Sequence, residues 1–494
     1  MLLLFSLAPF FLFVSLMFWK KASLLLVSSL SLLLTIILAV FYWQILPVYL
    51  SASIIKGLFV ALDIFIIIFG AIFFLEILKA TKIIGNLCLY LESLSKDYRV
   101  QVIVLAWFLG NFIEGTAGFG TPAAVVAPLL IGLGLTPITA VIVSLLGNST
   151  STAFGAAGTP IRVGFAGLNV SSVPLDAALI GLIGFIVPVF MLWIVTRDKV
   201  KQKENFLEAL PFAIWAGLAF VLPALATVFL GQEFPSILGA VIGMVLIFIT
   251  IRLKLFMPKT VRKLREEELQ KPSLSFTKVI FPYAFLVLLL IIGKFVLGTT
   301  GIPVNFGIKH TFTFFNPGLA FLLAGLPVIF FIAKDKKLAL VSLKTSFKRA
   351  LQPFLVIAVM SALVQIMIYS GNNRSGLLAP LEYLASSLKV AWLPFISPFI
   401  GAFGSFLTGS ATISNIMFGD LLATASQIIN LNAGKILALE LVGAAAGNMI
   451  ALADILAAEA VVGLKEKTRT VLKGVFIPCL IYVLLIGIVG MLFV

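Results

Sequence analysis

The sequence has few of the side chains that soluble enzymes use for chemistry. It contains one histidine and two cysteines, and Cys88 and Cys479 lie far apart and outside any Cys-x-x-Cys motif. This pattern supports neither a disulfide framework nor a cysteine-ligated metal site. Charged residues are also scarce, at 11% of the chain against about a quarter in soluble domains. We therefore expect no bound metal and no cofactor, and a soluble enzyme is a poor interpretation.

Apolar residues are what the chain has in excess. They make up 61% of the sequence, and the mean hydropathy is +1.18. Apolar stretches near the length of about 20 residues that a helix needs to cross a bilayer recur along the chain. They lack the alternating pattern of barrel strands, so helices must satisfy the backbone in lipid. We predict full-length spans at 1–19, 24–43, 57–78, 173–196, 207–230, 235–256, 276–298, 313–333, 350–370 and 472–494.

Two further apolar stretches, 100–165 and 391–462, are interrupted by Gly, Pro, Ser, Thr, Asn and acidic residues. Plain helices do not fit this composition, so we predict broken or re-entrant helices in both. The expected fold class is an all-α polytopic membrane protein with about 12–14 membrane segments.

The formal net charge of +15 does not indicate a nucleic-acid partner, because of where the basic residues fall. The intervening loops carry at most one basic residue, as at Lys56, Lys309 and Arg374. This positive-inside pattern predicts a multi-pass plasma-membrane protein with both termini outside, whose basic loops meet anionic lipid. It leaves the oligomeric state open. The basic clusters follow roughly every second span, at Lys20 and Lys21, 79–99, 197–203, 252–271, 334–349 and 465–473.

The two broken stretches resemble each other. The eight residues from Gly110 to Ala117 align without gaps on those from Gly404 to Ala411, and each half has a later Gly-Asn pair, Gly147-Asn148 and Gly447-Asn448. The charge pattern starts the first stretch inside and the second outside, so we predict inverted repeats, which are typical of secondary transporters. The predicted boundaries are 1–204 for the first repeat, 205–275 for a two-helix connector with a basic cytoplasmic linker, and 276–494 for the second repeat.

The first break is predicted around Glu114-Gly-Thr116-Ala-Gly-Phe-Gly-Thr121-Pro122. Its glycines lower helix propensity, and Thr121-Pro122 has the pattern of an N-cap followed by proline at the first helical position. The new helix would present free N–H groups to a carboxylate. The alternative is that small residues here only allow close helix packing.

The second break is predicted in a cluster of hydroxyl and amide side chains, Thr408, Ser410, Thr412, Ser414 and Asn415, in which Ser414 is the expected cap. A carboxylate substrate needs hydrogen-bond donors, and a guanidinium binds one in a forked geometry. Arg162 therefore joins the candidates, although an outer-loop arginine is an equal interpretation. The predicted substrate-binding residues are Thr116, Thr121, Asn148, Ser149, Arg162, Thr408, Ser410, Thr412 and Asn448.

Four acidic residues, Glu114, Glu440, Asp454 and Glu459, fall at apparent membrane depth. A carboxylate there costs several kcal/mol unless it is neutralised, so such residues usually serve ion or proton pathways. Glu114 is the first candidate for proton coupling, with Asp454 and Glu440 next. The alternative is a structural cap or an interfacial ion pair. The only histidine, His310, lies beside Lys309 in a predicted outer loop, and we expect it to be solvated.

The motifs closely resemble those of the L-lactate permease family. The resemblance is carried by Phe112–Pro122, Phe154–Ile161, Phe403–Thr412 and Gly447–Ala451, in that order along the chain. It implies proton-coupled symport of L-lactate and related 2-hydroxy monocarboxylates such as glycolate. Two other functions stay open: a sodium-coupled or antiporting carrier of another small organic anion, and a membrane-embedded lipid enzyme. The enzyme would need a nucleophile–base pair or metal ligands, which this sequence does not offer.

Overall fold

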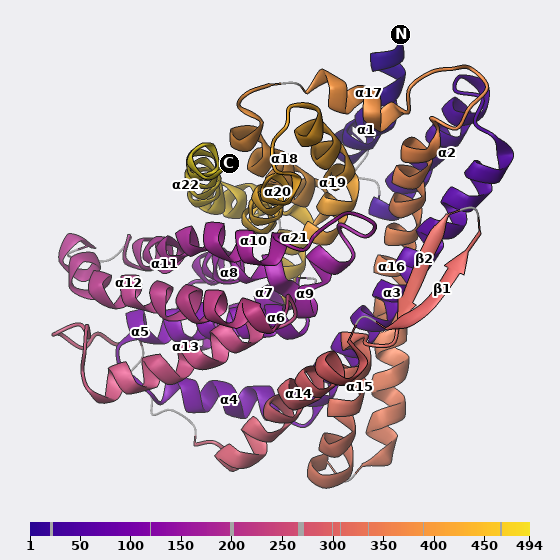
Figure 1. Ribbon diagram of the computed structural model, residues 1–494. Helices are drawn as coiled ribbons and strands as arrows, with labels where there is room; N and C mark the ends of the chain where they lie inside the picture. The colour runs from indigo at the N-terminus through magenta and orange to yellow at the C-terminus, as the bar shows by residue number, and fades with distance from the viewer. Residues whose placement is uncertain are drawn as a thin grey trace.

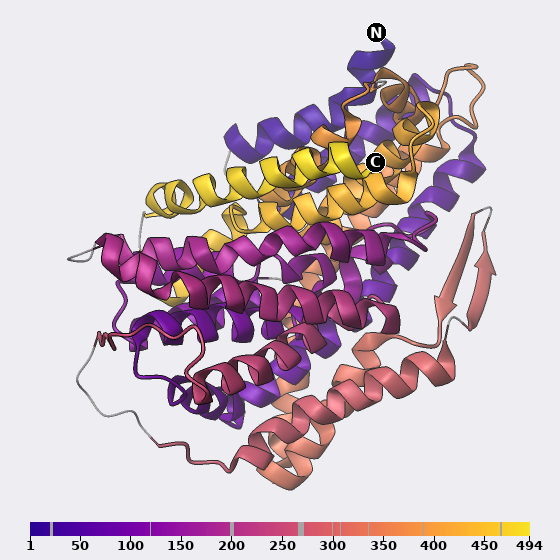
Figure 2. The same cartoon turned by 60° about the vertical axis from the view of Figure 1, so that its left-hand side comes forward.

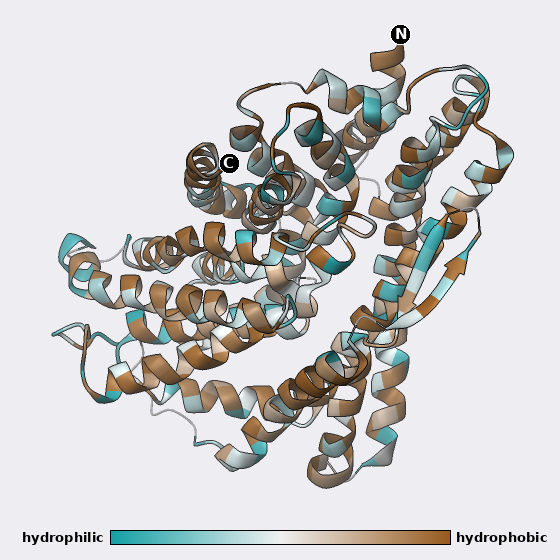
Figure 3. Ribbon diagram, viewed as in Figure 1, coloured by the Kyte–Doolittle hydropathy of each residue, from teal (hydrophilic) through white to brown (hydrophobic). Residues whose placement is uncertain are grey.

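The computed structural model describes residues 1–19, 23–118, 120–197, 202–264, 271–298, 300–306, 308–333, 335–388, 390–464 and 467–494. In these ranges the chain is almost wholly helical, as predicted (Figure 1). Nine of the described helices are long and apolar enough to cross a membrane, or ten if one bent pair is counted. Their residues are mostly hydrophobic (Figure 3). The chain is therefore a multi-pass membrane protein. Of the basic clusters, Lys20, Lys21, Lys199, Lys201, Arg265, Lys334 and Lys465 lie outside the described residues.

Two helices of 34 residues each, α3 (Pro47–Ala80) and α16 (Lys336–Tyr369), lie side by side (Figure 1). They run antiparallel: the Ser53 hydroxyl donates to the carbonyl of Gln365 at 3.3 Å, while the Arg349 guanidinium pairs with Glu76 at 2.6 Å. Both helices extend beyond the predicted spans, 57–78 and 350–370. The Lys-rich start of α16 adds turns that hydropathy ignores, since Lys, Leu and Ala are good helix formers.

The structure contains three elements that the sequence did not predict. The short helices α4 (Ile83–Glu92) and α17 (Pro380–Ser387) lie below the length of a membrane span. The strands β1 (Gly301–Asn305) and β2 (Lys309–Thr313) form an antiparallel hairpin that projects from the helices (Figure 2). The predicted span 313–333 therefore begins later, as α15 (Pro317–Pro327), which continues as a π-helical turn to Ala333.

The first broken segment follows α4. One helix runs through α5 (Tyr98–Ile103), a π-helical turn (Val104–Leu109) and α6 (Gly110–Thr116), and the chain resumes as α7 (Thr121–Gly132). The next pair, α8 (Pro137–Gly147) and the segment Ser151–Arg162, is bent by 51°. That segment ends in α9 (Gly155–Arg162). The span α10 (Val173–Gly181) and α11 (Val187–Thr196) follows.

The second half repeats this order of elements after α16 and α17. It has the broken pairs α18 (Leu393–Thr408) with α19 (Ala411–Ile428) and α20 (Ala433–Asn448) with α21 (Leu452–Val461), then the span α22 (Thr468–Phe493). Between the halves lie α12 (Gln202–Thr227) and α13 (Pro235–Arg252), followed by α14 (Phe276–Leu297). The remaining helices, α1 (Leu2–Trp19) and α2 (Leu24–Phe41), precede α3.

Glycines allow the helices before and after each break to touch backbone to backbone. A Cβ at Gly147 would collide with the Ala106 carbonyl, and one at Gly447 would collide with Ala402. Gly443 likewise lies directly against the Pro398 backbone. The glycine of each Gly-Asn pair thus packs on the helix that precedes the break in its own half, and this brings the asparagine to the break.

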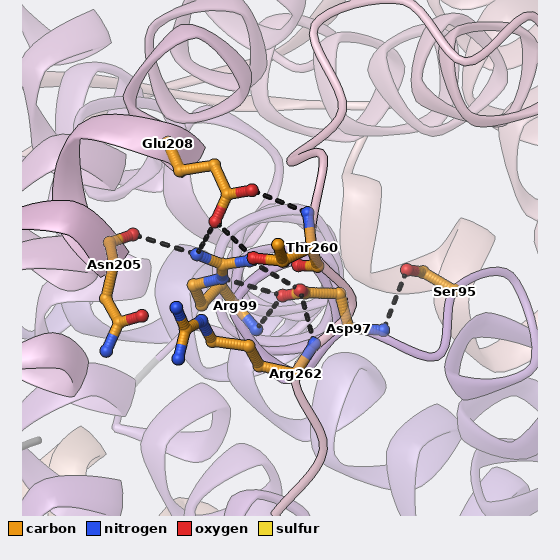
Figure 4. A network of polar contacts seen from close by, with 7 residues as sticks. All are labelled: Ser95, Asp97, Arg99, Asn205, Glu208, Thr260 and Arg262. Atoms are coloured by element: carbon orange, nitrogen blue, oxygen red, sulfur yellow. Dashed lines mark hydrogen bonds and ion pairs between the residues drawn. The ribbon is translucent and has the colours of Figure 1, made fainter. Parts of the chain in front are cut away.

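A buried polar network joins α5, α12 and the chain after α13 (Figure 4). The Arg99 guanidinium is fully buried and donates to both carboxylate oxygens of Asp97, at 3.0 and 2.7 Å. It also donates to Glu208 at 3.1 Å and to the carbonyls of Asn205 and Thr260. The Arg262 N–H donates to Asp97 at 3.0 Å. Ends of three elements are therefore held together by one arginine.

Candidate functional site

Both helix breaks line one small cavity, the central pocket. Its lining comes from α6 and the first break, α9 and the turn before it, the second break, and the end of α20. Only about 20 Å³ is open to a sphere the size of water, which is room for about one water molecule. A substrate therefore needs the pocket to widen. The lining residues are Glu114, Gly118, Thr152, Gly155, Ala156, Thr159, Pro160, Gly409, Ser410, Ala411, Thr412 and Asn448.

Each break uses glycine in a left-handed conformation. The residue before α7 is Gly120, with φ +72°, and the residue after α18 is Gly409, with φ +71°. The predicted caps are wrong by a few residues. Thr121 is the first residue of α7 and donates its hydroxyl to the Gly118 carbonyl at 2.7 Å. At the second break Ser410, rather than Ser414, caps α19 by accepting from the Ile413 N–H at 3.3 Å.

The Glu114 carboxyl group lies at the first break and is 3% exposed. The Asn148 side chain donates to its Oε2 at 3.0 Å. Two glycines leave it room, because a Cβ at Gly155 would lie 2.5 Å from Oε1 and one at Gly118 would lie 3.5 Å from it. The Gly-Asn pair of the first half therefore positions the acid of the first break.

The Asp454 carboxyl group comes from the first turn of α21 and is 6% exposed. It lies against the opposite half, since a Cβ at Gly120 would be 2.6 Å from its Oδ1. It is also within electrostatic range of Glu114. Two acids separated by 340 positions in sequence thus meet beside the two breaks.

The third predicted acid, Glu440, does not line the central pocket. It is fully buried between α20 and its neighbours, with the Ser414 hydroxyl 3.5 Å from Oε1 and no hydrogen-bond partner for Oε2 among the described residues. Within the same part of the chain, no Lys or Arg side chain forms an ion pair with Glu114, Asp454 or Glu440. The ionised forms of these groups lack a compensating charge.

The backbone near the start of α9, within the second segment of the bent pair, is strained. Ala156, Ala157 and Gly158 all have positive φ, at +41°, +52° and +78°. A left-handed conformation costs a non-glycine residue roughly 1–2 kcal/mol. The Thr159 hydroxyl closes this turn by donating to the Ala156 carbonyl at 2.6 Å. Strain of this kind concentrates at functional sites, and here it lines the central pocket.

The predicted substrate-binding residues divide into groups. Ser410, Thr412 and Asn448 line the central pocket, and Asn148 holds Glu114. Arg162 lies outside this pocket, where its guanidinium donates to the Thr313 hydroxyl and the Phe315 carbonyl. Sequence reasoning missed Thr152 and Thr159 as pocket residues. Thr152 follows the predicted Asn148 and Ser149 closely, and Thr159 lies in the motif Phe154–Ile161. The others donate their hydroxyls to nearby backbone carbonyls: Thr116, Thr121, Ser149 and Thr408.

A larger cavity lies between α1, α17, α18 and α19, with a volume of about 470 Å³. Its lining residues are apolar except for Ser387. None of them is charged, and none belongs to a helix break. An anion has no partner there. The central pocket is therefore the better candidate site, although it is smaller.

The comparison with known proteins covers almost the whole chain. The sequence profile of the L-lactate permease family matches residues 3–301 and 295–494. The chain belongs to the L-lactate permease family. Its relatives include the L-lactate permease of Escherichia coli K12, 28% identical over 89% of this chain and 86% of the relative, and that of Salmonella typhi, 26% identical over 94% and 90%. The glycolate permease of Escherichia coli K12 is 26% identical over 94% and 90%.

Membership of the permease family makes this chain a transporter rather than an enzyme. The lipid-enzyme interpretation is therefore wrong. The permease motifs that carried the resemblance are those at the two breaks, at the start of α9 and at the second Gly-Asn pair. They include pocket residues from both halves of the chain.

Proposed function

We propose that this permease is a proton-coupled symporter of L-lactate and related 2-hydroxy monocarboxylates such as glycolate in the plasma membrane. The substrate class is supported by the names of its relatives, L-lactate permease and glycolate permease. The coupling is supported by one observation above all: Glu114 and Asp454 approach each other beside the pocket, and neither forms an ion pair with a Lys or Arg among the described residues.

The two halves of the chain, 1–204 and 276–494, form inverted repeats in this proposal, with both termini outside and 205–275 as the connector. The recurring order of elements after α3 and α16 supports the repeat. The matching contacts of Gly147 and Gly447 support it further. Inversion follows from the charge pattern and would let each half open the pocket to one side.

The substrate binds to neutral hydrogen-bonding groups of the second half, across the pocket from Thr152 and Thr159 of the first half. Its carboxylate meets Ser410, Thr412 and the first N–H groups of α19, an 18-residue helix whose positive dipole end lies at the pocket. Its 2-hydroxyl meets the Asn448 amide. Arg162 lies at the end of α9, outside the central pocket. In this proposal it contacts the substrate before the substrate reaches that pocket.

Coupling arises from charge. A lactate anion beside an ionised Glu114 would bring like charges together in a site that excludes water, and Asp454 would add to the repulsion. Protonation of Glu114, or of Asp454, removes this penalty. The anion therefore binds stably only with a proton, and the pair crosses the membrane as a neutral unit. Glu440 lies away from the pocket and is a secondary candidate.

The test is uptake of labelled lactate, glycolate and pyruvate into proteoliposomes, with the pH and sodium gradients varied independently. We expect an inward proton gradient to drive accumulation, and a sodium gradient at equal pH to drive none. If a sodium gradient alone drives accumulation, the coupling ion is sodium and not the proton. Exchange without net accumulation would indicate an antiporter.

A further inference from the structure

A second cavity lies beside the central pocket and has a different character. It has a volume of about 320 Å³, which is within the roughly 300–1,000 Å³ range of small-molecule sites. We call it the basic cavity. Its lining comes from α3, the end of α9 and the turn after it, and β2: Lys56, Val60, Asp63, Arg162, Val163, Ala166, Gly167, Lys309, His310, Thr311 and Thr313.

The charge of the basic cavity is positive. Three basic side chains, Lys56, Arg162 and Lys309, face one carboxylate, Asp63. Of these, Arg162 is held by the neutral Thr313 and Phe315 and stacks on the Phe315 ring, 5.7 Å from its centre. These contacts orient the guanidinium without neutralising it.

His310 is buried in the wall of the basic cavity, not solvated as predicted. Its Nδ1 is 3.1 Å from the Lys56 ammonium and its Nε2 is 3.0 Å from Asp63. An ammonium can only donate, so Nδ1 accepts and the proton sits on Nε2, which donates to Asp63. The imidazole therefore occupies one oxygen of Asp63, the only carboxylate among the described residues that line the cavity.

The nearest other carboxylate is engaged elsewhere. Glu233, in the turn between α12 and α13, is within electrostatic range of Arg162, but it pairs with Lys294 of α14 at 3.1 Å. The Lys294 ammonium also lies 5.8 Å from the centre of the Phe315 ring, the same ring that Arg162 contacts. Among the described residues, Glu233 is therefore compensated by Lys294 and does not cancel the positive charge of the basic cavity.

The basic cavity and the central pocket share one element. Ala156, Thr159 and Pro160 line the central pocket, and Arg162 and Val163, one turn later, line the basic cavity. A ligand that leaves one space along this segment reaches the other within a single helical turn. The basic cavity is the roomier of the two as the structure stands.

We propose that the basic cavity is a capture site, where a small carboxylate binds to Arg162, Lys309 and Lys56 before it reaches the central pocket. The identity of that carboxylate as the transported one rests on the proposed function. The positive charge concentrates the anion at the mouth of a narrow path, an effect that raises association rates and weakens with salt.

The first experiment measures transport. Lys309→Gln removes an exposed charge, and Arg374→Gln is the matched control, an exposed cation in another predicted outer loop that does not line the cavity. At about 10 mM salt, where the Debye length is about 30 Å, we expect the KM for lactate to rise about three- to ten-fold in Lys309→Gln with kcat unchanged. The difference should shrink below about two-fold at about 1 M salt. Equal KM values at low salt in an active protein would overturn the capture site.

The second experiment does not depend on transport, so it separates this inference from the proposed function. Thr311→Cys places an exposed thiol in the basic cavity, and Ser171→Cys is an exposed control outside it. The native Cys88 and Cys479 are buried. Lactate, glycolate or acetate should slow labelling of Thr311→Cys by an anionic thiosulfonate at least about three-fold, and should leave the control unchanged, in vesicles of phosphatidylcholine alone.

Two outcomes of the labelling would contradict the inference. Equal labelling of both cysteines with and without carboxylate would mean that the cavity binds no small anion. Protection by added phosphatidylglycerol, with none by free carboxylates, would assign the cavity to a lipid headgroup. A wild-type protein that transports no lactate, yet shows carboxylate protection at Thr311→Cys, would refute the proposed function and leave the capture site standing for another carboxylate.

Discussion

Two buried polar regions of this permease treat charge in opposite ways. In the network around Arg99, the guanidinium has two acidic partners and two backbone carbonyls, and the Asp97 carboxylate is also satisfied by the Arg262 N–H. At the central pocket, Glu114 has one neutral amide partner and Asp454 has no ion pair among the described residues. The Arg99 and Asp97 side chains and the Glu114 and Asp454 carboxyl groups are all buried.

The difference separates structural charge from functional charge. A buried charge that holds elements together needs complete pairing, because removing one partner leaves the other uncompensated. A group that must gain and lose a proton needs the reverse, since a permanent cationic partner would hold it ionised. Substitutions in the two regions should therefore differ: loss of a paired charge should lower stability, and loss of an unpaired one should affect coupling.

The largest effect is expected at Arg99. Arg99→Met leaves Asp97 buried without its cation, and breaking a buried pair in this way costs about 3–5 kcal/mol. The measurement is thermal unfolding in detergent, with the yield of monodisperse protein as a second readout. Arg252→Met removes an exposed arginine and should change stability by no more than about 0.5 kcal/mol. Equal unfolding temperatures for the two variants would mean that the network is not structural.

The next effect concerns coupling without loss of the fold. Glu114→Gln keeps the shape and the contact with Asn148, so the unfolding temperature should stay close to that of the wild type. Uphill, pH-driven accumulation of lactate should be lost, while counterflow exchange of preloaded lactate persists, because the neutral side chain mimics only the protonated state. If this variant keeps the pH dependence of the wild type, Glu114 does not carry the proton, and Asp454 becomes the first candidate for that role.

A smaller effect is expected for the ligand's hydroxyl group. Unlike the saturated Arg99 network, the central pocket keeps neutral polar groups such as Ser410 and Asn448 for a ligand. A ligand without the 2-hydroxyl would leave such a group unpaired, at about 1–3 kcal/mol, which is roughly a ten- to hundred-fold loss of affinity. Glycolate should therefore compete well with labelled lactate, and propionate poorly. Equal inhibition would exclude hydroxyl recognition.

The smallest effect is expected at Glu440. It is buried away from the pocket with one weak hydroxyl contact, so a neutral amide of the same shape should replace a neutral acid at little cost. Glu440→Gln should keep accumulation within about two-fold and stability within about 1 kcal/mol. Loss of accumulation comparable to that of Glu114→Gln would add Glu440 to the proton path and weaken the division drawn here.

The sequence predicted the helix breaks well because their causes are local. Clustered glycine and Thr-Pro are visible without any tertiary information. The observed breaks, between the end of α6 at Thr116 and the start of α7 at Thr121 and at Gly409–Ser410, fall where expected. Pairings between distant elements were not visible. Nothing near Asp454 in sequence indicates that it faces Gly120, and nothing near His310 indicates that it would be buried between Lys56 and Asp63.

Other errors arose from small competing effects. Gly409 can take a left-handed conformation, so the second break closes there and Ser410 becomes the cap instead of Ser414. The strands β1 and β2 lie between the predicted spans 276–298 and 313–333, in a stretch that was interpreted as an outer loop. Short helices such as α4 fall below any window chosen to detect membrane spans.

The contact between α18 and α20 restricts how this protein can move. Gly401, Gly443 and Gly447 leave no space for even a methyl group between the two backbones. Helices in such contact cannot slide or rotate past each other without losing the fit of three separate positions at once. Any transport cycle must therefore carry α18 and α20 as a single rigid body, with the change of shape confined to the turns at their ends and to the surfaces that they present to the rest of the protein.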